Sequence, residues 1–210
     1  MKHLLLIAFF GGEASAATAQ RAPDPSAYYA RPAKVRFGAK VGLNLSNTDF
    51  NRGFPAPVVP VETNWRPGVA AGFTLQVPVG QRGFSVQQEY LFSQLGGRVS
   101  ATGTTYTLRY LSLPLLLKYG VSRRLAVLAG PQADLLIQAS QQISGTSTDI
   151  THDTEERSVG ATAGLEYFLG PRLSLTARYV HGLNHVGLGQ RSAVTEFKFE
   201  AVQLSADVKF

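Results

Sequence analysis

The stretch KVRFGAKVGLNLS (34–46) alternates between two kinds of side chain without a break. Successive side chains of a β-strand point to opposite faces, so this period of two predicts a strand with one apolar and one polar or small face. The apolar face carries Val35, Phe37, Ala39, Val41, Leu43 and Leu45, and the other face carries Arg36, Gly38, Lys40, Gly42 and Asn44.

Seven further segments follow the same pattern, which brings the predicted strands to eight. They are GVAAGFTLQV (68–77), FSVQQEYLFS (84–93), YLSLPLLLKYG (110–120), LAVLAGPQADLLIQ (125–138), SVGATAGLEYFL (158–169), LSLTARYV (173–180) and AVQLSADVKF (201–210). Seven of the eight have ten to fourteen residues, enough to cross a hydrocarbon layer, which needs roughly 9 to 11 tilted residues, and LSLTARYV has eight. Strands of soluble proteins usually have about 5 or 6 residues.

The links between these segments alternate between longer and tight. The links 47–66, 96–105, 139–157 and 185–196 are long or medium, whereas VGQRG (79–83), GVSRR (120–124) and GPR (170–172) are tight. Short turns at one rim and longer loops at the other are typical of up-and-down membrane barrels. We therefore predict an all-β fold, an eight-stranded antiparallel up-and-down transmembrane β-barrel.

The N-terminus and the composition place this barrel in the cell envelope. Residues 1–19 combine Lys2, an apolar run over 4–10 and small-residue sites, which predicts a signal peptide cleaved near residue 16 or 19. Residues 20–33 would form a short periplasmic segment, and 34–210 the outer-membrane barrel. The absence of cysteine excludes disulfides, thiolate metal sites and a lipoprotein anchor. The net charge of +6 is spread thinly, so we expect no nucleic-acid partner.

Charged side chains decide which strand face meets lipid. An arginine or lysine on the lipid face near the midplane costs about 2 to 4 kcal/mol, so the charged parity should point into the barrel. This assigns an interior polar network of Arg36, Lys40, Glu89, Asp134, Glu166, Arg178 and Asp207. By the same parity Leu173, Leu175 and Ala177 face lipid, as do Val202, Leu204, Ala206 and Val208, while Lys118 and Lys209 turn inward.

Aromatic residues then fall near the two expected membrane interfaces. Phe37, Phe84, Tyr119, Tyr167 and Phe210 lie at the short-turn ends of their strands, and Phe92, Tyr106 and Tyr179 toward the long-loop ends. Some residues break the pattern. Gln88 lands on the lipid face, Leu91 and Leu116 land inside, and Phe197 and Phe199 fall out of phase with the last strand, which a bulge or a wrong strand limit would explain. Pro114 lacks a ladder donor, so we expect a bulge or a locally opened seam there.

A resemblance to a known family rests on four stretches and the terminal Phe210. The stretches are YLSLPLLLKYG, LAGPQADLL, ATAGLEYFLG and LTARYVHGLNHV. The chain resembles the small outer-membrane β-barrel proteins, whose members include the PorT-like proteins, over roughly 35–210. The resemblance implies an eight-stranded barrel and a C-terminal aromatic, here Phe210, that is read by the barrel-assembly machinery. A PorT-like member would take part in secretion.

No constellation of residues indicates catalysis, a metal or a cofactor. Interior charges favour salt bridges over a gated proton or ion path, because buried charges must be paired. His181 and His185, spaced four apart on a strand, would lie about 13 Å from each other, too far to share an ion unless the loop folds back. The loop acids Asp149, Asp153, Glu155 and Glu156, with His152, indicate a solvated rim more than a calcium site.

We therefore expect a structural, anchoring or interaction role through the extracellular loops, with PorT-like secretion as one case. The expected partners are outer-membrane lipid and the barrel-assembly machinery, and a protein partner outside the cell or in a secretion system is compatible with the loops. The chain is expected to be a monomer. Two alternatives remain open: a lipid-modifying enzyme using Ser192 and His185, and a soluble periplasmic ligand-binding barrel.

Overall fold

The computed structural model describes residues 34–52, 58, 60–80, 83–188 and 195–210, which form ten strands and two short 3-10 helices. The strands are β1 (Arg36–Asp49), β2 (Thr63–Val79), β3 (Phe84–Val99), β4 (Thr105–Gly120), β5 (Leu125–Ile143), β6 (Thr146–Asp149), β7 (Arg157–Phe168), β8 (Leu173–Gly182), β9 (Val186–Leu188) and β10 (Thr195–Lys209). The 3-10 helices are η1 (Phe50–Arg52) and η2 (Thr151–Asp153). No helix of the described residues is long and apolar enough to cross a membrane.

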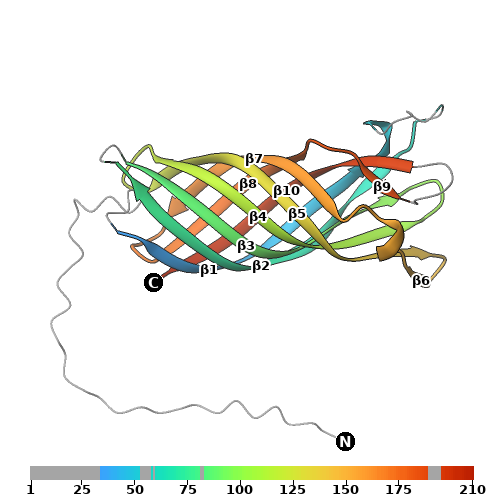
Figure 1. Ribbon diagram of the computed structural model, residues 1–210, viewed down its shortest axis with the longest axis horizontal. Helices are drawn as coiled ribbons and strands as arrows, with labels where there is room; N and C mark the ends of the chain where they lie inside the picture. Colours follow the sequence, from blue (N-terminus) through green and yellow to red (C-terminus); the bar gives the residue numbers. More distant parts are fainter. Residues whose placement is uncertain (1–33, 53–57, 59, 81–82, 189–194) are drawn as a thin grey trace, which may run out of the picture.

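Eight of the strands form a closed antiparallel barrel, as predicted (Figure 1). The order β1-β2-β3-β4-β5-β7-β8-β10 is closed by pairing of β10 with β1, from Gly38↔Lys209 to Asp49↔Lys198. The two remaining strands are short: β6 pairs with β5 and β9 with β10. Closure pairs the first strand with the last, so the barrel has no free sheet edge.

The two ends of the barrel differ. The C-terminus and the links 121–124 and 169–172 lie at one end, where β2 also ends and β3 begins, and we call it the short-turn end (Figure 1). At the other, the long-loop end, lie β6, β9 and both 3-10 helices. Strands β3 and β4 run further than expected, so the link predicted at 96–105 shrinks to residues 100–104.

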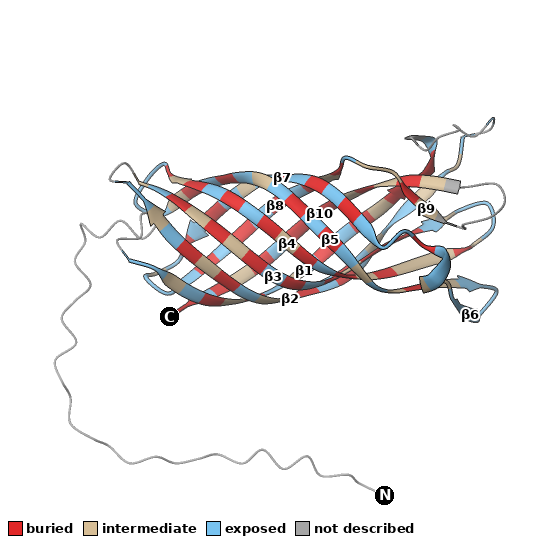
Figure 2. Cartoon of the chain, in the orientation of Figure 1, coloured by how far each residue is buried: buried red, intermediate tan, exposed pale blue. Residues whose placement is uncertain are grey.

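Burial alternates residue by residue along the barrel strands (Figure 2). In β8 the outward Leu173, Leu175 and Ala177 are exposed and the inward Ser174, Thr176 and Arg178 are buried. The same alternation holds along β1, β7 and β10, and it places Gln88 outside and Leu91 and Leu116 inside, as expected. The outer wall is therefore apolar and the lumen is filled by the other parity.

Pro114 produces no bulge. The pairs Gln88↔Leu115 and Leu91↔Ser112 keep one register on either side of it, with the ladder between β3 and β4 interrupted only in between. The bulge expectation was wrong, and the locally opened seam describes the site. Register shifts occur instead between Trp65 and Ala70 of β2 and between Arg109 and Tyr110 of β4.

One glycine shows how tightly the strands curve. A Cβ on Gly72 of β2 would lie 1.9 Å from the backbone oxygen of Tyr90 in β3, which real Cβ atoms do not tolerate. Glycine at this position therefore permits the close backbone approach that a small, strongly bent sheet requires.

Candidate functional site

The lumen nearer the short-turn end is organised around the carboxylate of Glu89. Lys40 of β1 donates to Glu89 Oε1 at 2.5 Å, and Arg178 of β8 donates to Oε2 at 2.7 Å. Gln87 also donates to Oε1 at 2.5 Å. The side chains of Lys40, Glu89 and Arg178 are at most 1% exposed, so these charges are neutralised by each other and not by water.

Glu89 belongs to a longer row of alternating charges, which we call the charge chain. Its members, in spatial order, are Arg178, Glu89, Lys40, Asp207, Lys209, Glu166 and Lys118. Lys40 lies 3.5 Å from Asp207, Lys209 lies 3.2 Å from Asp207 and 3.8 Å from Glu166, and Lys118 pairs with Glu166. Four cations therefore share three carboxylates, and each carboxylate contacts two cations.

Neutral side chains complete this network. Gln87 Oε1 accepts from Lys118 at 2.9 Å and from Lys209 at 3.3 Å. Ser174 donates to Glu166 at 2.6 Å, and Thr176 donates to Asp207 at 3.3 Å. These contacts come from β3, β4, β7, β8 and β10, so the network ties the barrel together across its lumen as well as around its wall.

Five of the seven residues predicted for the interior network lie in the charge chain: Lys40, Glu89, Glu166, Arg178 and Asp207. Asp134 is buried but apart from the chain, and it accepts from Gln132 at 2.9 and 3.2 Å. Arg36 is half-buried at the short-turn end, within electrostatic reach of Glu166. Lys118 and Lys209 were expected to point inward but were not predicted for the network, and both belong to the charge chain. Their inward parity was the signal that could have identified them.

The lumen toward the long-loop end has the opposite character. A cluster of buried apolar side chains, which we call the apolar plug, fills it: Phe50, Leu95, Leu108, Tyr110, Ala139, Val180, Val186, Phe197, Phe199 and Ala201. Phe197 and Phe199 pack edge to face at 4.8 Å between ring centroids, and Tyr110 and Phe199 do so at 5.7 Å. Phe50 of η1 covers Phe197 at 5.3 Å.

The plug accounts for two features of the sequence. Phe197 and Phe199 need no bulge, since β10 keeps one register with β1 from Lys198 to Lys209 and both rings share the inward parity of Gln203. The other explanation, a wrong strand limit, is confirmed, because β10 begins at Thr195 and not at residue 201. Tyr106 was expected at the lipid interface, which is wrong: its ring packs against the plug and lies 5.8 Å from that of Phe50. The Tyr106 error arose because an aromatic side chain was expected to face outward even at the height where the lumen itself is apolar.

A small cavity separates the two layers. It is lined on the polar side by Asp134, Gln132, Arg178 and Gln203, and on the apolar side by residues that include Phe199. Its volume is about 10 Å³, close to the minimum that holds one water molecule. Solutes larger than water therefore do not fit at this height of the lumen.

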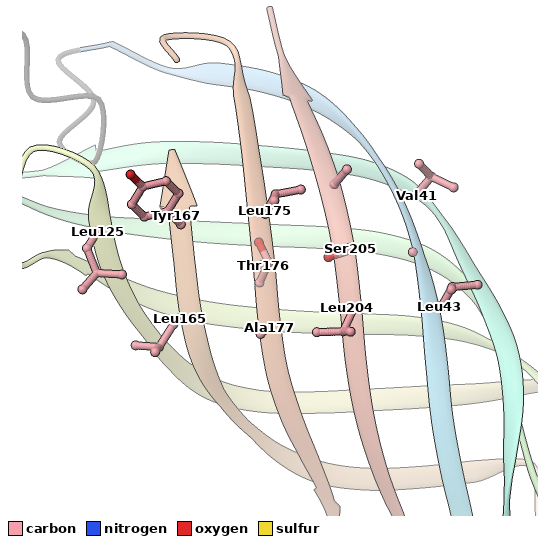
Figure 3. A pocket seen from close by; sticks show the side chains of 12 residues that line it. Val41, Leu43, Leu125, Leu165, Tyr167, Leu175, Thr176, Ala177, Leu204 and Ser205 are labelled. Carbon is pink, nitrogen blue, oxygen red and sulfur yellow. The ribbon is translucent and has the colours of Figure 1, made fainter. Parts of the chain in front are cut away.

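The outer wall is apolar and carries a groove (Figure 3). Leu165 and Tyr167 of β7, Leu175 of β8, and Leu204 of β10 surround it, and its volume is about 510 Å³. Thr176 and Ser205 alternate with the outward residues on the same strands. An apolar surface of this kind suits contact with lipid chains.

The other aromatics predicted for the interfaces lie on the outer wall. Phe37, Phe84, Tyr167 and Phe210 are exposed near the short-turn end, where Tyr119 contacts Phe84 at 4.7 Å. Tyr179 and Phe92 are exposed further toward the long-loop end. These residues lie at two levels of the outer wall, and the surface between the levels carries mostly Leu, Val and Ala together with the exposed pair Phe73 and Tyr90.

The histidines and loop acids do not converge on one site. His181 lies 3.8 Å from Glu200, and His185 lies 3.9 Å from Glu196. Ser192, the suggested nucleophile, lies outside the described residues. Among the residues that are described, no three histidine or acidic side chains gather as metal ligands would.

Asp149 of the β5–β6 hairpin has a local role. A hydrogen bond from the Thr151 side chain, one from the Thr151 backbone N–H at 2.8 Å and one from Gln138 hold the pKa of Asp149 below its ordinary value. Glu155 instead accepts from Gly187 N–H at 3.4 Å, in the β9 hairpin. The acids therefore stabilise separate turns.

Comparison with known proteins now adds to this geometry. The family model described as outer membrane protein beta-barrel domain matches residues 18–187. The chain belongs to this family. It is thus an outer-membrane β-barrel, and its apolar outer wall is the lipid-facing surface. The alternative of a soluble ligand-binding barrel is wrong.

Three solved structures are similar to this chain. Neisserial surface protein A is 13% identical with a TM-score of 0.50, over 84% of this chain and 97% of that chain. Ail, the attachment invasion locus protein of Yersinia pestis, is 15% identical with a TM-score of 0.49, over 84% and 99%. OprG of Pseudomonas aeruginosa is 12% identical with a TM-score of 0.44, over 84% and 96%. No curated protein sequence matches this chain significantly.

Proposed function

We propose that this chain is a sealed, non-enzymatic barrel that holds its long-loop end at the cell surface, where that end acts as an anchoring or interaction surface. The observation that carries the proposal is the filling of the lumen by two successive layers, the charge chain and the apolar plug. An eight-stranded barrel is just wide enough for side chains to fill, so these layers leave no aqueous path. The surface exposed at the long-loop end is then the part of the barrel that can act on other molecules.

The barrel has one orientation in the membrane and reaches it by export. The short-turn end faces the periplasm, and residues 1–19 act as a signal peptide that is removed on export. The barrel-assembly machinery reads Phe210, which ends the outer wall with its side chain exposed and its N–H bonded to the Phe37 carbonyl. The barrel works as a monomer in outer-membrane lipid.

Catalysis is not part of the proposal. The His185 side chain faces Glu196 across the base of the β9–β10 hairpin, an arrangement that supports the hairpin without requiring a nucleophile. If the lipid-modifying alternative held, replacing His185 with alanine would abolish a lipid-hydrolysing activity of the folded protein. A PorT-like secretion role remains one case within the interaction role and has no feature of its own in the described residues.

Conductance of the purified barrel in planar lipid bilayers tests the seal. The wild-type protein should insert without conductance steps, because the plug and the charge chain both block the lumen. A variant with Phe197→Ala and Phe199→Ala removes the centre of the plug, whereas Phe92→Ala, on the outer wall, is the matched control. Stable ohmic channels from the wild-type protein would contradict the proposal.

A further inference from the structure

Three arginines lie on neighbouring strands of the outer wall at the long-loop end. Arg98 of β3 and Arg109 of β4 occupy outward positions, on the same face of their strands as the exposed Phe92 and Leu111. Arg66 of β2 reaches past β3 and donates to Thr107 Oγ1 at 3.1 Å, at another outward position of β4. We call this set the arginine wall.

The arginine wall begins where the apolar band ends. Phe92 and Leu111 pair across β3 and β4, and Arg109 follows two residues beyond Leu111, about 7 Å along the strand. Arg98 pairs with Thr105, about 13 Å further along. The polar head-group layer of a leaflet lies directly outside its hydrocarbon. Arg109 therefore lies at head-group level and Arg98 above it.

Arg98 also lines a hollow between two hairpin tips. Thr102 and Thr105 line one side and Gln142 and Ser144 line the other, in a volume of about 370 Å³. Residues at both tips have a positive φ, with Gly103 at +65° and Gly145 at +89°. The lining side chains are a guanidinium, hydroxyls and a carboxamide, with no carboxylate among them. Such donors suit a phosphate or the hydroxyls of a sugar, and a guanidinium can bind a phosphate through two parallel hydrogen bonds.

Charge at this end of the barrel is uneven around the wall. Carboxylates flank the arginine wall: Glu62 next to Ser100, and Asp149, which already accepts hydrogen bonds from Thr151 and Gln138. On the outward face of β1 and β10, at the same end, acids predominate: Asp49, Glu196 and Glu200, with Lys198 between them. Arg157 of β7 is a further exposed arginine at this end, away from the wall. A non-specific attraction to an anionic membrane would not require three arginines on neighbouring strands, so the grouping of Arg66, Arg98 and Arg109 points to a localised ligand.

We propose that the arginine wall binds the phosphorylated sugar head group of an outer-leaflet glycolipid. Arg109 and Arg66 hold a phosphate at the edge of the acyl layer, and Arg98 with its hollow holds the sugar portion above. This inference rests on the proposed orientation, with the long-loop end outside. It adds a ligand class to the interaction surface, and it does not depend on whether the lumen is sealed.

Native mass spectrometry of the folded protein, with lipid added, tests the proposal. The probes are diphosphorylated lipid A and the same lipid with its phosphates removed. The wild-type protein should bind the phosphorylated form at least about tenfold more tightly, as expected for charge-assisted hydrogen bonds to phosphate. Equal binding of the two lipids would overturn the proposal without any variant.

Two triple variants locate the site. Arg66→Gln with Arg98→Gln and Arg109→Gln should remove the preference for the phosphorylated lipid. The control variant, Arg123→Gln with Arg124→Gln and Arg172→Gln, removes the same charge at the short-turn end. It should keep the preference for the phosphorylated lipid. If both variants lose the preference equally, binding is general attraction and the site is refuted. Inorganic phosphate is the third probe: if it displaces the lipid at comparable concentration, the ligand is free phosphate and not a lipid.

The seal and the lipid site fail separately. A conducting wild-type barrel that still prefers the phosphorylated lipid overturns the sealed-barrel proposal and leaves the arginine wall in place. A non-conducting barrel without the preference for the phosphorylated lipid overturns the arginine wall and leaves the sealed-barrel proposal in place. Folding of each variant is checked by the shift in gel mobility on boiling, and the wild-type comparison decides the proposal if the triple variant does not fold.

Discussion

Replacing Glu89 with glutamine should destabilise the barrel more than any neutral substitution on its surface. Glu89 is the shared partner of Lys40 at 2.5 Å and Arg178 at 2.7 Å, and all three side chains are buried. Glutamine keeps the shape and can still accept a hydrogen bond, but two buried cations lose their charge partner. Breaking a buried ion pair in this way costs about 3–5 kcal/mol.

The expected loss lies near the middle of that range, because Lys40 keeps a second carboxylate, Asp207, at 3.5 Å, whereas Glu89 is the only carboxylate paired with Arg178 among the described residues. Urea-driven unfolding in lipid vesicles measures it, with the gel mobility of unboiled samples as the readout. With a urea slope of about 1–3 kcal/mol/M, a loss of about 4 kcal/mol moves the midpoint by more than 1 M.

The matched controls separate charge from shape. Glu62→Gln, at an exposed position, should change the free energy of unfolding by less than about 0.5 kcal/mol. The double variant Glu89→Gln with Arg178→Gln should lose less than the sum of the two single variants, since no unpaired guanidinium is left. If Glu89→Gln alone shifts the free energy of unfolding by less than about 1 kcal/mol, the charge chain does not stabilise the lumen as argued.

Three further predictions concern the wall and the loops. Leu204→Arg, on the lipid-facing groove, should lower the free energy of unfolding in vesicles by about 2–4 kcal/mol. Thr105→Arg, above the apolar band, should lower it by at most about 1 kcal/mol. Equal losses for the two variants would place the membrane at a different height on the barrel. Gly72→Ala should cost about 1–3 kcal/mol because its Cβ would meet the Tyr90 backbone, while Gly170→Ala, with nothing within 4 Å, should be near neutral in vesicle unfolding. Carboxyl NMR should show that the pKa of Asp149 lies below that of free aspartate. Because the folded pKa is depressed, Asp149 stabilises the hairpin above the unfolded pKa, and this stabilisation is lost as pH falls through the folded pKa. A pKa equal to that of free aspartate would refute the Thr151 contacts.

The faces of the strands could be predicted because one residue along a strand reverses the direction of the side chain. Once Lys40 and Arg178 were assigned inward, the parity of every other residue on β1 and β8 followed. Partners across the lumen could not be predicted in this way. Glu89 on β3 and Arg178 on β8 are 89 residues apart and lie on strands that do not pair, so no local pattern joins them.

The apolar plug was missed for a different reason. The inward parity of β10 changes from polar at Gln203 to aromatic at Phe199 and Phe197, and this change was attributed to a bulge or a wrong strand limit, of which the second is confirmed. In a membrane barrel the lipid requires an apolar outer face only over the thickness of the hydrocarbon. Beyond it, the inward side chains are free to be apolar, and the long-loop end of this barrel is closed by a small hydrophobic core of ordinary type.

Labelling in intact cells tests most directly whether this barrel spans the outer membrane with its long-loop end outside. The chain has no cysteine, so single cysteines can be introduced without background. Thr148→Cys in β6 and Val121→Cys in the turn after β4 are both exposed, at opposite ends of the barrel. A large maleimide-polymer that cannot cross the outer membrane should label Thr148→Cys in intact cells and Val121→Cys only after lysis. Labelling of Val121→Cys in intact cells, or of neither variant before lysis, would contradict the account.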